Sequence, residues 1–155
     1  MDTARFSSPV GMITITADGD SITGLSIGHD QESRESTNPC LREAQLQLKQ
    51  YFLGQRTSFD LACAIRGTPF QEKIWSALEE IGYGETLTYG ELAERIGKPG
   101  SARAVGGAVG ANPVPIIIPC HRVMGISGAI TGYSAGDGIP TKKALLDLEG
   151  ITYRF

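Results

Sequence analysis

Cys120 and His121 are adjacent in the chain and follow an apolar run, Pro115–Ile118, that ends at Pro119. Because proline cannot donate a backbone hydrogen bond, Pro119 interrupts a regular ladder and fixes the chain direction next to the thiol. The thiolate is the reactive form of cysteine, and a neighbouring imidazole can accept its proton. The pair is therefore a candidate nucleophile and base. Cysteine is also among the most often buried residue types, so a simple core role for Cys120 stays open at this point.

The composition is that of a folded protein with an uneven charge distribution. The 155 residues fit one domain or two small ones, and 41% hydrophobic with 20% charged residues excludes a disordered chain. A net charge of −3 argues against nucleic-acid binding, yet no acidic residue lies between Glu94 and Asp137. That stretch holds four cations: Arg95, Lys98, Arg103 and Arg122. They form either a local positive surface or a chance cluster.

The cysteines and histidines do not fit a metal site. Cys40, Cys63 and Cys120 are far apart, and His29 and His121 are the only histidines, so no zinc spacing exists and we expect no metal. The sequence shows no signal peptide and no long apolar span. We therefore expect a cytoplasmic protein of a reducing compartment with no membrane partner.

The first 67 residues predict a small N-terminal α/β domain with an antiparallel sheet. Residues 11–17 and 21–27 alternate apolar and polar positions around the hairpin signal Asp18-Gly19-Asp20. Asn38 is a predicted N-cap, with Pro39 at the first position of a helix to about Leu53. The apolar stripe of this helix is Leu41, Ala44, Leu48 and Tyr51. Residues 58–62 read as one more strand.

Residues 68–155 predict a mainly helical C-terminal domain of winged-helix or helix-turn-helix type, which makes the fold class α+β. Capping boxes at Thr68–Gln71 and Thr88–Glu91 open two helices, the first reaching about Ile81. Ser101 is a predicted N-cap for a helix over 102–110, and a last helix runs from Pro140 to Gly150. Two short helices joined by a glycine turn bind DNA in some proteins and are only scaffold in others.

The predicted helix over 102–110 has an unusual composition, being built of Ala, Gly and Val with Arg103 as its only charge. Each glycine inside a helix costs about 1 kcal/mol relative to alanine. Small side chains permit close approach either to a neighbouring helix or to a narrow DNA groove. The helix lacks the Asn and Gln side chains that read base edges, which favours shape-based docking with one inserted side chain. An ordinary surface position remains the alternative for Arg103.

Two stretches, Ala102–Ala108 and Asn112–Val123 with its Pro-Cys-His-Arg block, resemble the signature of the O6-alkylguanine-DNA alkyltransferases. The strong resemblance covers Thr68–Val123 and continues more loosely to Gly150, whereas the first 67 residues fit in outline only. It implies binding of double-stranded DNA through the minor groove, flipping of an O6-alkylguanine, and irreversible transfer of the alkyl group to a cysteine, once per molecule. It also implies that no cofactor is needed, that O4-alkylthymine is a second substrate, and that a monomer binds DNA, with cooperativity.

The resemblance implies a role for each matching residue. Cys120 is the nucleophile, His121 takes the thiol proton through a water, and Glu149 orients the imidazole. Tyr89 donates a proton or hydrogen bond to the base ring. The base pocket is formed by Pro115, Val123, Tyr133 and Ser134. DNA contacts fall on Ser101, Ala102, Arg103 and Ala104, with Arg103 filling the gap left by the flipped base. Asn112 supports the thiol by tying the turn after the helix to an active-site strand. Without the resemblance, Tyr89 is a packed aromatic residue and Glu149 a solvated carboxylate near a helix end.

The sequence departs from the family pattern after Tyr133. The segment Ser134–Pro140 is longer than usual, and Ala135 stands where the family commonly has glycine. Because this loop borders the implied pocket, the range of alkyl groups is not fixed by the resemblance. Three alternatives are compatible with parts of the sequence: an alkyltransferase-like protein that recognises lesions without transfer, a cysteine hydrolase, and a helix-turn-helix regulator. Cys120 argues against the first, the polar surroundings of His29 against the second, and the helix over 102–110 against the third.

Overall fold

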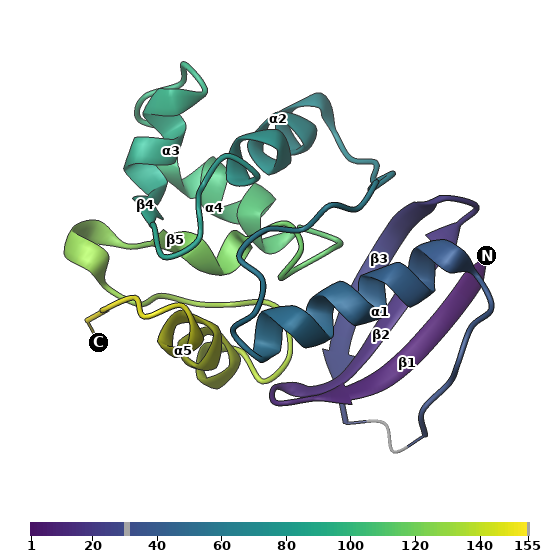
Figure 1. Ribbon diagram of the computed structural model, residues 1–155. Helices are drawn as coiled ribbons and strands as arrows, with labels where there is room; N and C mark the ends of the chain where they lie inside the picture. The colour runs from purple at the N-terminus through teal and green to yellow at the C-terminus, as the bar shows by residue number, and fades with distance from the viewer. Residues whose placement is uncertain (30–31, 155) are drawn as a thin grey trace. The chain divides into compact units, whose positions relative to one another are not determined.

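The computed structural model describes residues 1–29 and 32–154 and divides the chain into two compact units, Met1–Ile65 and Arg66–Phe155 (Figure 1). The predicted division between residues 67 and 68 lies slightly further along the chain. Phe155, the last residue of the predicted C-terminal domain, lies outside the described residues. The expected α+β class, with an antiparallel sheet in the N-terminal part and helices in the C-terminal part, is confirmed.

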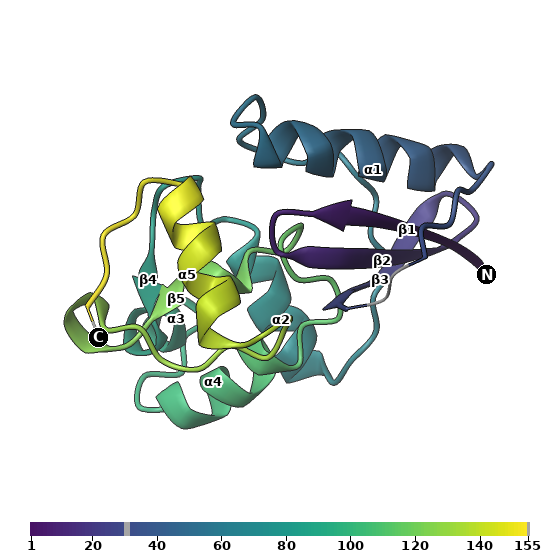
Figure 2. The same cartoon turned by 90° about the horizontal axis from the view of Figure 1, so that it is seen from below.

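The first unit is a three-stranded antiparallel sheet covered by one helix. The strands β1 (Asp2–Ser8), β2 (Gly11–Asp18) and β3 (Ser21–Gly28) lie in sequence order. The helix α1 (Pro39–Phe52) packs against one face of the sheet, as the edge-on view in Figure 2 shows. The core between them is apolar: Ala4, Ile13, Ile15, Ile22, Leu41, Ala44, Leu48 and Tyr51 are all buried. The predicted helix stripe is therefore confirmed.

In this unit one strand was not predicted, and one predicted strand is absent. The strand β1 was not predicted, because its alternation rests on only Ala4 and Phe6 among polar neighbours. The predicted strand over 58–62 does not form, and the chain instead meets the sheet at an isolated bridge between Ile22 and Cys63. A single bridge satisfies few backbone groups, so this segment stays irregular.

The second unit is mainly helical. Its helices are α2 (Pro69–Leu78), α3 (Tyr89–Arg95), α4 (Ala102–Gly110) and α5 (Ile139–Leu148), with 3₁₀ turns η1 (Cys120–Arg122) and η2 (Ile126–Gly128). Two short strands, β4 (Leu87–Thr88) and β5 (Val123–Met124), pair in parallel. Both predicted capping boxes are formed in full, by Thr68 with Gln71 and by Thr88 with Glu91. The helix α2 ends at Leu78, one turn before the predicted end.

The helix α4 contacts both α2 and α3 and is held at its far end by Trp75, whose indole Nε1 donates to the Ala108 carbonyl at 2.9 Å. Ser101 occupies the predicted N-cap position. Its hydroxyl, however, donates to the Lys98 carbonyl at 2.6 Å and does not accept from a helix amide. The predicted N-cap position is therefore confirmed, but the Ser101 hydroxyl does not bond a helix amide, because the tight turn offers it the Lys98 carbonyl.

The segment between α4 and η1 is a series of turns and not the expected strand. Pro115 and Ile118 form an isolated bridge, and the Ile118 amide donates to the Val114 carbonyl at 3.0 Å. Ile116, which is buried, has a φ of 74°. A left-handed conformation costs a residue with a Cβ roughly 1–2 kcal/mol. The surrounding packing therefore forces the backbone into a strained turn just before Cys120.

Candidate active site

Cys120 begins the 3₁₀ turn η1 and is 6% exposed. Its amide donates to the Ile118 carbonyl at 2.8 Å, and its carbonyl accepts from the Val123 amide. Burial raises the pKa of the Cys120 thiol, while hydrogen bonds with Asn112 and Tyr133 and the charge of Lys142 act in the opposite direction. The thiol is thus held in a fixed turn and needs a base to ionise.

Asn112 joins three parts of the chain next to this thiol. Its Nδ2 donates to the Ile118 carbonyl at 2.8 Å, and its Oδ1 accepts from the Val114 amide at 3.0 Å. The same side chain also lowers the pKa of the Cys120 thiol. A primary amide has the two donors and one acceptor oxygen that such a junction uses. Asn112 therefore fixes the strained turn and the thiol together.

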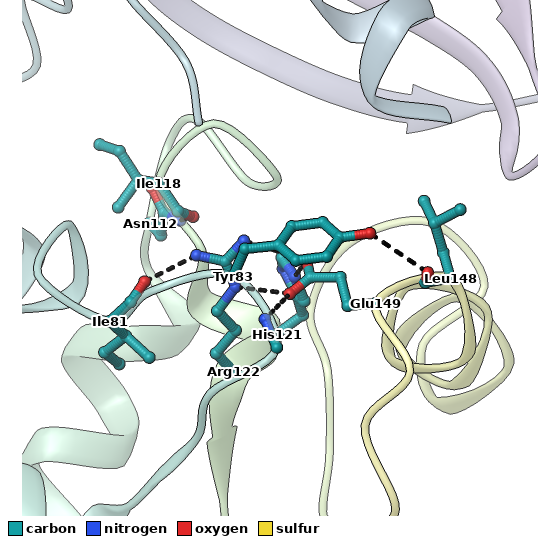
Figure 3. A network of polar contacts seen from close by, with 9 residues as sticks. Ile81, Tyr83, Asn112, Ile118, His121, Arg122, Leu148 and Glu149 are labelled. Carbon is teal, nitrogen blue, oxygen red and sulfur yellow. Dashed lines mark hydrogen bonds and ion pairs between the residues drawn. The ribbon is translucent and has the colours of Figure 1, made fainter. Parts of the chain in front are cut away.

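His121 and Glu149 form a buried pair (Figure 3). His121 Nε2 and Glu149 Oε2 are 2.6 Å apart, and both side chains are 0% exposed. Burial lowers the pKa of His121, although the hydrogen bond and charge of Glu149 oppose the shift, so the imidazole is neutral at pH 7. A carboxylate can only accept, so Nε2 carries the proton and Nδ1 carries a lone pair. Nδ1 is buried and has no hydrogen-bond partner in the part of the chain that is described.

The Glu149 carboxylate has further partners that the sequence did not indicate. Arg122 donates to it from Nε at 2.8 Å and from Nη2 at 3.1 Å, and the Gly84 amide donates at 3.2 Å. The remaining Arg122 nitrogen, Nη1, donates to the Ile81 carbonyl at 2.7 Å, as Figure 3 shows. Glu149 is therefore a buried, fully bonded anion and not a solvated carboxylate.

Arg122 is buried and is not part of the positive surface that the sequence suggested. It is 6% exposed, and its guanidinium lies 5.8 Å from the centre of the Tyr83 ring. It cannot contribute to a positive surface, whereas Arg95, Lys98 and Arg103 are exposed. Its position directly after His121 was the one available signal, and nothing local distinguishes a buried arginine from an exposed one.

Lys142 was also missed. It lies in the second turn of α5, is 1% exposed, and donates from Nζ to the Val123 carbonyl at 2.7 Å. Burial lowers the pKa of Lys142 to about 8, while the charge of Cys120 acts in the opposite direction. Lysine is almost never fully buried without a partner, so no sequence pattern predicts this placement.

Tyr89 and Ser134 approach α4 at two of its glycines. The Tyr89 hydroxyl lies 3.2 Å from Thr131 Oγ1, and a Cβ added at Gly106 would lie 3.8 Å from the Tyr89 ring. A Cβ added at Gly110 would lie 3.0 Å from Ser134 Oγ. These glycines, one turn apart, let Tyr89 and the loop after Tyr133 lie close to the helix. The small residues of α4 were expected to allow close approach to a neighbouring part of the protein or to DNA. At Gly106 and Gly110 the neighbour is the protein itself.

The other predicted residues fall into two groups. Pro115 and Val123 are buried on either side of Cys120 in the chain. On α4, Arg103 and Ala104 are exposed, Ser101 and Ala102 are half-buried, and Gly107 faces open space. The structure joins His121 to Glu149 by a hydrogen bond, and it places Asn112 and Tyr133 close enough to Cys120 to lower the pKa of its thiol. Arg103, Ala104 and Gly107 instead form an exposed face of α4.

Among the described residues, no group of three or more His, Cys, Asp or Glu side chains is placed to hold a metal ion. No helix in the described ranges has the length and apolar character needed to cross a bilayer.

Comparisons with known proteins agree over both units. A family model described as "6-O-methylguanine DNA methyltransferase, ribonuclease-like domain" matches residues 3–65, and one described as "6-O-methylguanine DNA methyltransferase, DNA binding domain" matches residues 69–151. The methylated-DNA–protein-cysteine methyltransferase of Mycobacterium tuberculosis is 48% identical over 147 residues, covering 92% of this chain and 88% of its own. The constitutive enzyme of that name from Bacillus subtilis is 41% identical, covering 95% of this chain and 94% of its own.

Solved structures give the same result. The crystal structure of Mycobacterium tuberculosis OGT in complex with DNA has a TM-score of 0.84 and 44% sequence identity, and the match covers 96% of this chain and 92% of that chain. The resemblance stated from the sequence is thereby confirmed. With both domains matched over nearly their whole length, the chain belongs to the 6-O-methylguanine DNA methyltransferase family.

Proposed function

We propose that this protein repairs DNA directly, by transferring the alkyl group of an O6-alkylguanine to Sγ of Cys120, once per molecule. The observation that carries the proposal is the buried His121–Glu149 pair directly after Cys120 on η1, which leaves His121 Nδ1 with an unused lone pair. The names of the relatives, methylated-DNA–protein-cysteine methyltransferases, support the same reaction.

The chemistry follows from these positions. The thiol proton passes through a bridging water to His121 Nδ1, and Glu149 stabilises the imidazolium that forms. Sγ then attacks the alkyl carbon, so that an S–C bond forms and the C–O6 bond breaks. The bonding pair stays on the guanine, where Tyr89 donates a proton or hydrogen bond to the developing anion. The thioether product has no leaving group that water displaces readily, which accounts for a single turnover.

The exposed face of α4 supports DNA as the partner. Arg103 is a long cation on a helix face that is otherwise smooth, at Ala104 and Gly107. Such a face suits close contact with a minor groove and insertion of one side chain into the stack vacated by a flipped base. Ser101 and Ala102 lie at the start of the same helix. Pro115, Val123, Tyr133 and Ser134 are proposed to line the base pocket, and Asn112 to hold the thiol. From the resemblance alone, we also propose a cytoplasmic monomer that binds DNA cooperatively, with O4-alkylthymine as a second substrate.

Intact-protein mass spectrometry tests the proposal. After incubation with a duplex that carries O6-methylguanine, the protein should gain the mass of one methyl group, located on Cys120. Cys40→Ser, which removes a thiol near the start of α1, should gain the same mass, whereas Cys120→Ser should not. An unchanged mass together with tight binding of the lesion would instead indicate a lesion-recognition protein without transfer.

A further inference from the structure

Lys142 is a buried cation that the proposed reaction does not use. Its side chain is buried where α5 packs against η1, and its Nζ reaches the carbonyl of Val123, the residue that follows η1. Within the described chain the amine bonds only the Val123 carbonyl, although an ammonium has three N–H donors. A buried ammonium without a carboxylate partner is costly, so the position calls for another anion.

The anion that fits is the thiolate of Cys120. Val123, which Lys142 holds, donates its own amide to the Cys120 carbonyl and closes η1. The ammonium is therefore hydrogen-bonded to Val123, the residue that ends the turn carrying Cys120. Cys120 is the group whose charge raises the pKa of Lys142, and the charge of Lys142 in turn favours ionisation of Cys120.

The other charged and titratable groups around the thiol are already engaged. His121, on η1, is bonded to Glu149 at the end of α5, and Arg122 is bonded to that same carboxylate. Tyr133, from the loop before α5, lowers the pKa of the Cys120 thiol but carries no charge itself. Since Glu149 is neutralised by Arg122, Lys142 is left as the positive charge available to the sulfur.

We infer that Lys142 is a positioning residue for alkyl transfer: its ammonium, anchored on the Val123 carbonyl, is the counter-ion that the Cys120 thiolate meets when it forms. The effect of Lys142 on alkyl transfer depends on the proposed function, whereas its effect on the ionisation of Cys120 can be measured without it. The thiol proton still leaves to His121, and Lys142 neither gives nor takes a proton. Its contribution is electrostatic, in a site from which water is largely excluded.

The direct test is titration of Cys120 in the protein without DNA. In a Cys40→Ser, Cys63→Ser background, thiolate absorbance near 240 nm is followed against pH, with the matching Cys120→Ser protein subtracted to remove tyrosine ionisation. Lys142→Met removes the charge and keeps an unbranched chain. Lys142→Gln removes the charge but keeps an N–H donor for the Val123 carbonyl. Both should ionise Cys120 about one pH unit or more above the parent, a tenfold or greater loss of thiolate at a given pH.

The control is Lys143→Met, which removes the same charge one residue further along α5, where the side chain is not fully buried. It should titrate like the parent. Replacing an uncompensated buried charge by a neutral side chain is commonly tolerated, and circular dichroism verifies folding. If Lys142→Met fails to fold, Lys142→Gln carries the test. An unchanged titration in a folded variant would overturn the inference.

Single-turnover transfer supplies the second readout. The deficit of Lys142→Gln relative to the parent should be greatest at low pH and shrink as pH rises, because the thiol then ionises without help. A deficit that is equal at all pH values would mean that Lys142 only supports the Val123 carbonyl, and would also overturn the inference. Should the parent protein transfer no alkyl group at all, the proposed function fails while the titration still decides the role of Lys142.

Discussion

Arg122 and His121 bond to the same carboxylate, that of Glu149. Arg122 donates to it at 2.8 and 3.1 Å, and His121 Nε2 lies 2.6 Å from it. A bidentate guanidinium keeps a buried carboxylate ionised, and only an ionised carboxylate fixes the imidazole tautomer that leaves Nδ1 free. Arg122 therefore supports the base indirectly, by holding the charge of its orienting group.

Arg122→Met should accordingly damage both stability and transfer. Breaking one side of a buried ion pair leaves Glu149 poorly compensated and costs about 3–5 kcal/mol of unfolding free energy. The carboxylate also loses the charge that keeps it ionised, so transfer at neutral pH should slow as well. Urea denaturation and single-turnover kinetics measure the two effects. Arg95→Met, at an exposed position of α3, should change stability by less than about 0.5 kcal/mol. Equal effects of the two variants would contradict the buried role.

His121 gives a pH dependence of stability whose sign follows from its burial. Its pKa is lower in the folded protein than in the unfolded chain, so between the two values the unfolded state binds more protons. Stability is then complete above the unfolded value of about 6.5 and falls as pH decreases, by up to about 1.4 kcal/mol per pH unit. Chemical denaturation at pH 5 to 8 should show this slope, and His121→Gln should show a smaller one. The opposite slope would mean that the folded protein favours the imidazolium.

Features of the fold that depend on residues close in the chain were predicted from the sequence, and features that depend on distant residues were not. The caps at Asn38, Thr68 and Thr88 were correctly predicted because a cap is decided by residues three or four positions apart. The strands β4 and β5 were not predicted, since each has two residues and exists only through pairing with the other, 36 positions away. Pairing of this kind leaves no local period.

In the active site, too, some residues could be identified from the sequence and others could not. The Cys120–His121 pair could be read from the chain, and the resemblance supplied Glu149. The burial of Arg122 and Lys142 depends on where η1 and α5 meet, which no local pattern encodes. The φ of Ile116 likewise contradicts its β-branched side chain, and tertiary packing overrides the local preference there. Long-range contacts thus decide the electrostatics of the site.

Asn112 offers a test of whether charge or geometry limits the thiol. Asn112→Asp keeps an acceptor for the Val114 amide, loses the donor to the Ile118 carbonyl, and adds a negative charge beside Cys120. Asn112→Ala loses both bonds without adding charge. Because a like charge disfavours the thiolate, transfer should be slower in Asn112→Asp, and the pKa of Cys120 should be higher. Single-turnover rates and thiolate absorbance compare the two. A slower Asn112→Ala would show that the turn geometry dominates.

The glycines of α4 separate fold stability from DNA binding. Gly107 faces open space, so Gly107→Ala should stabilise the protein by roughly 1 kcal/mol through helix propensity. The added methyl group projects from the face that is proposed to meet DNA, and it should weaken binding of a duplex. Gly106→Ala brings the same helical gain but directs its methyl group to the Tyr89 ring, at an ordinary contact distance of 3.8 Å. Fluorescence anisotropy with a labelled duplex should therefore show weaker binding for Gly107→Ala alone. If both variants bind DNA as the parent does, the exposed face of α4 is not the surface that approaches the groove.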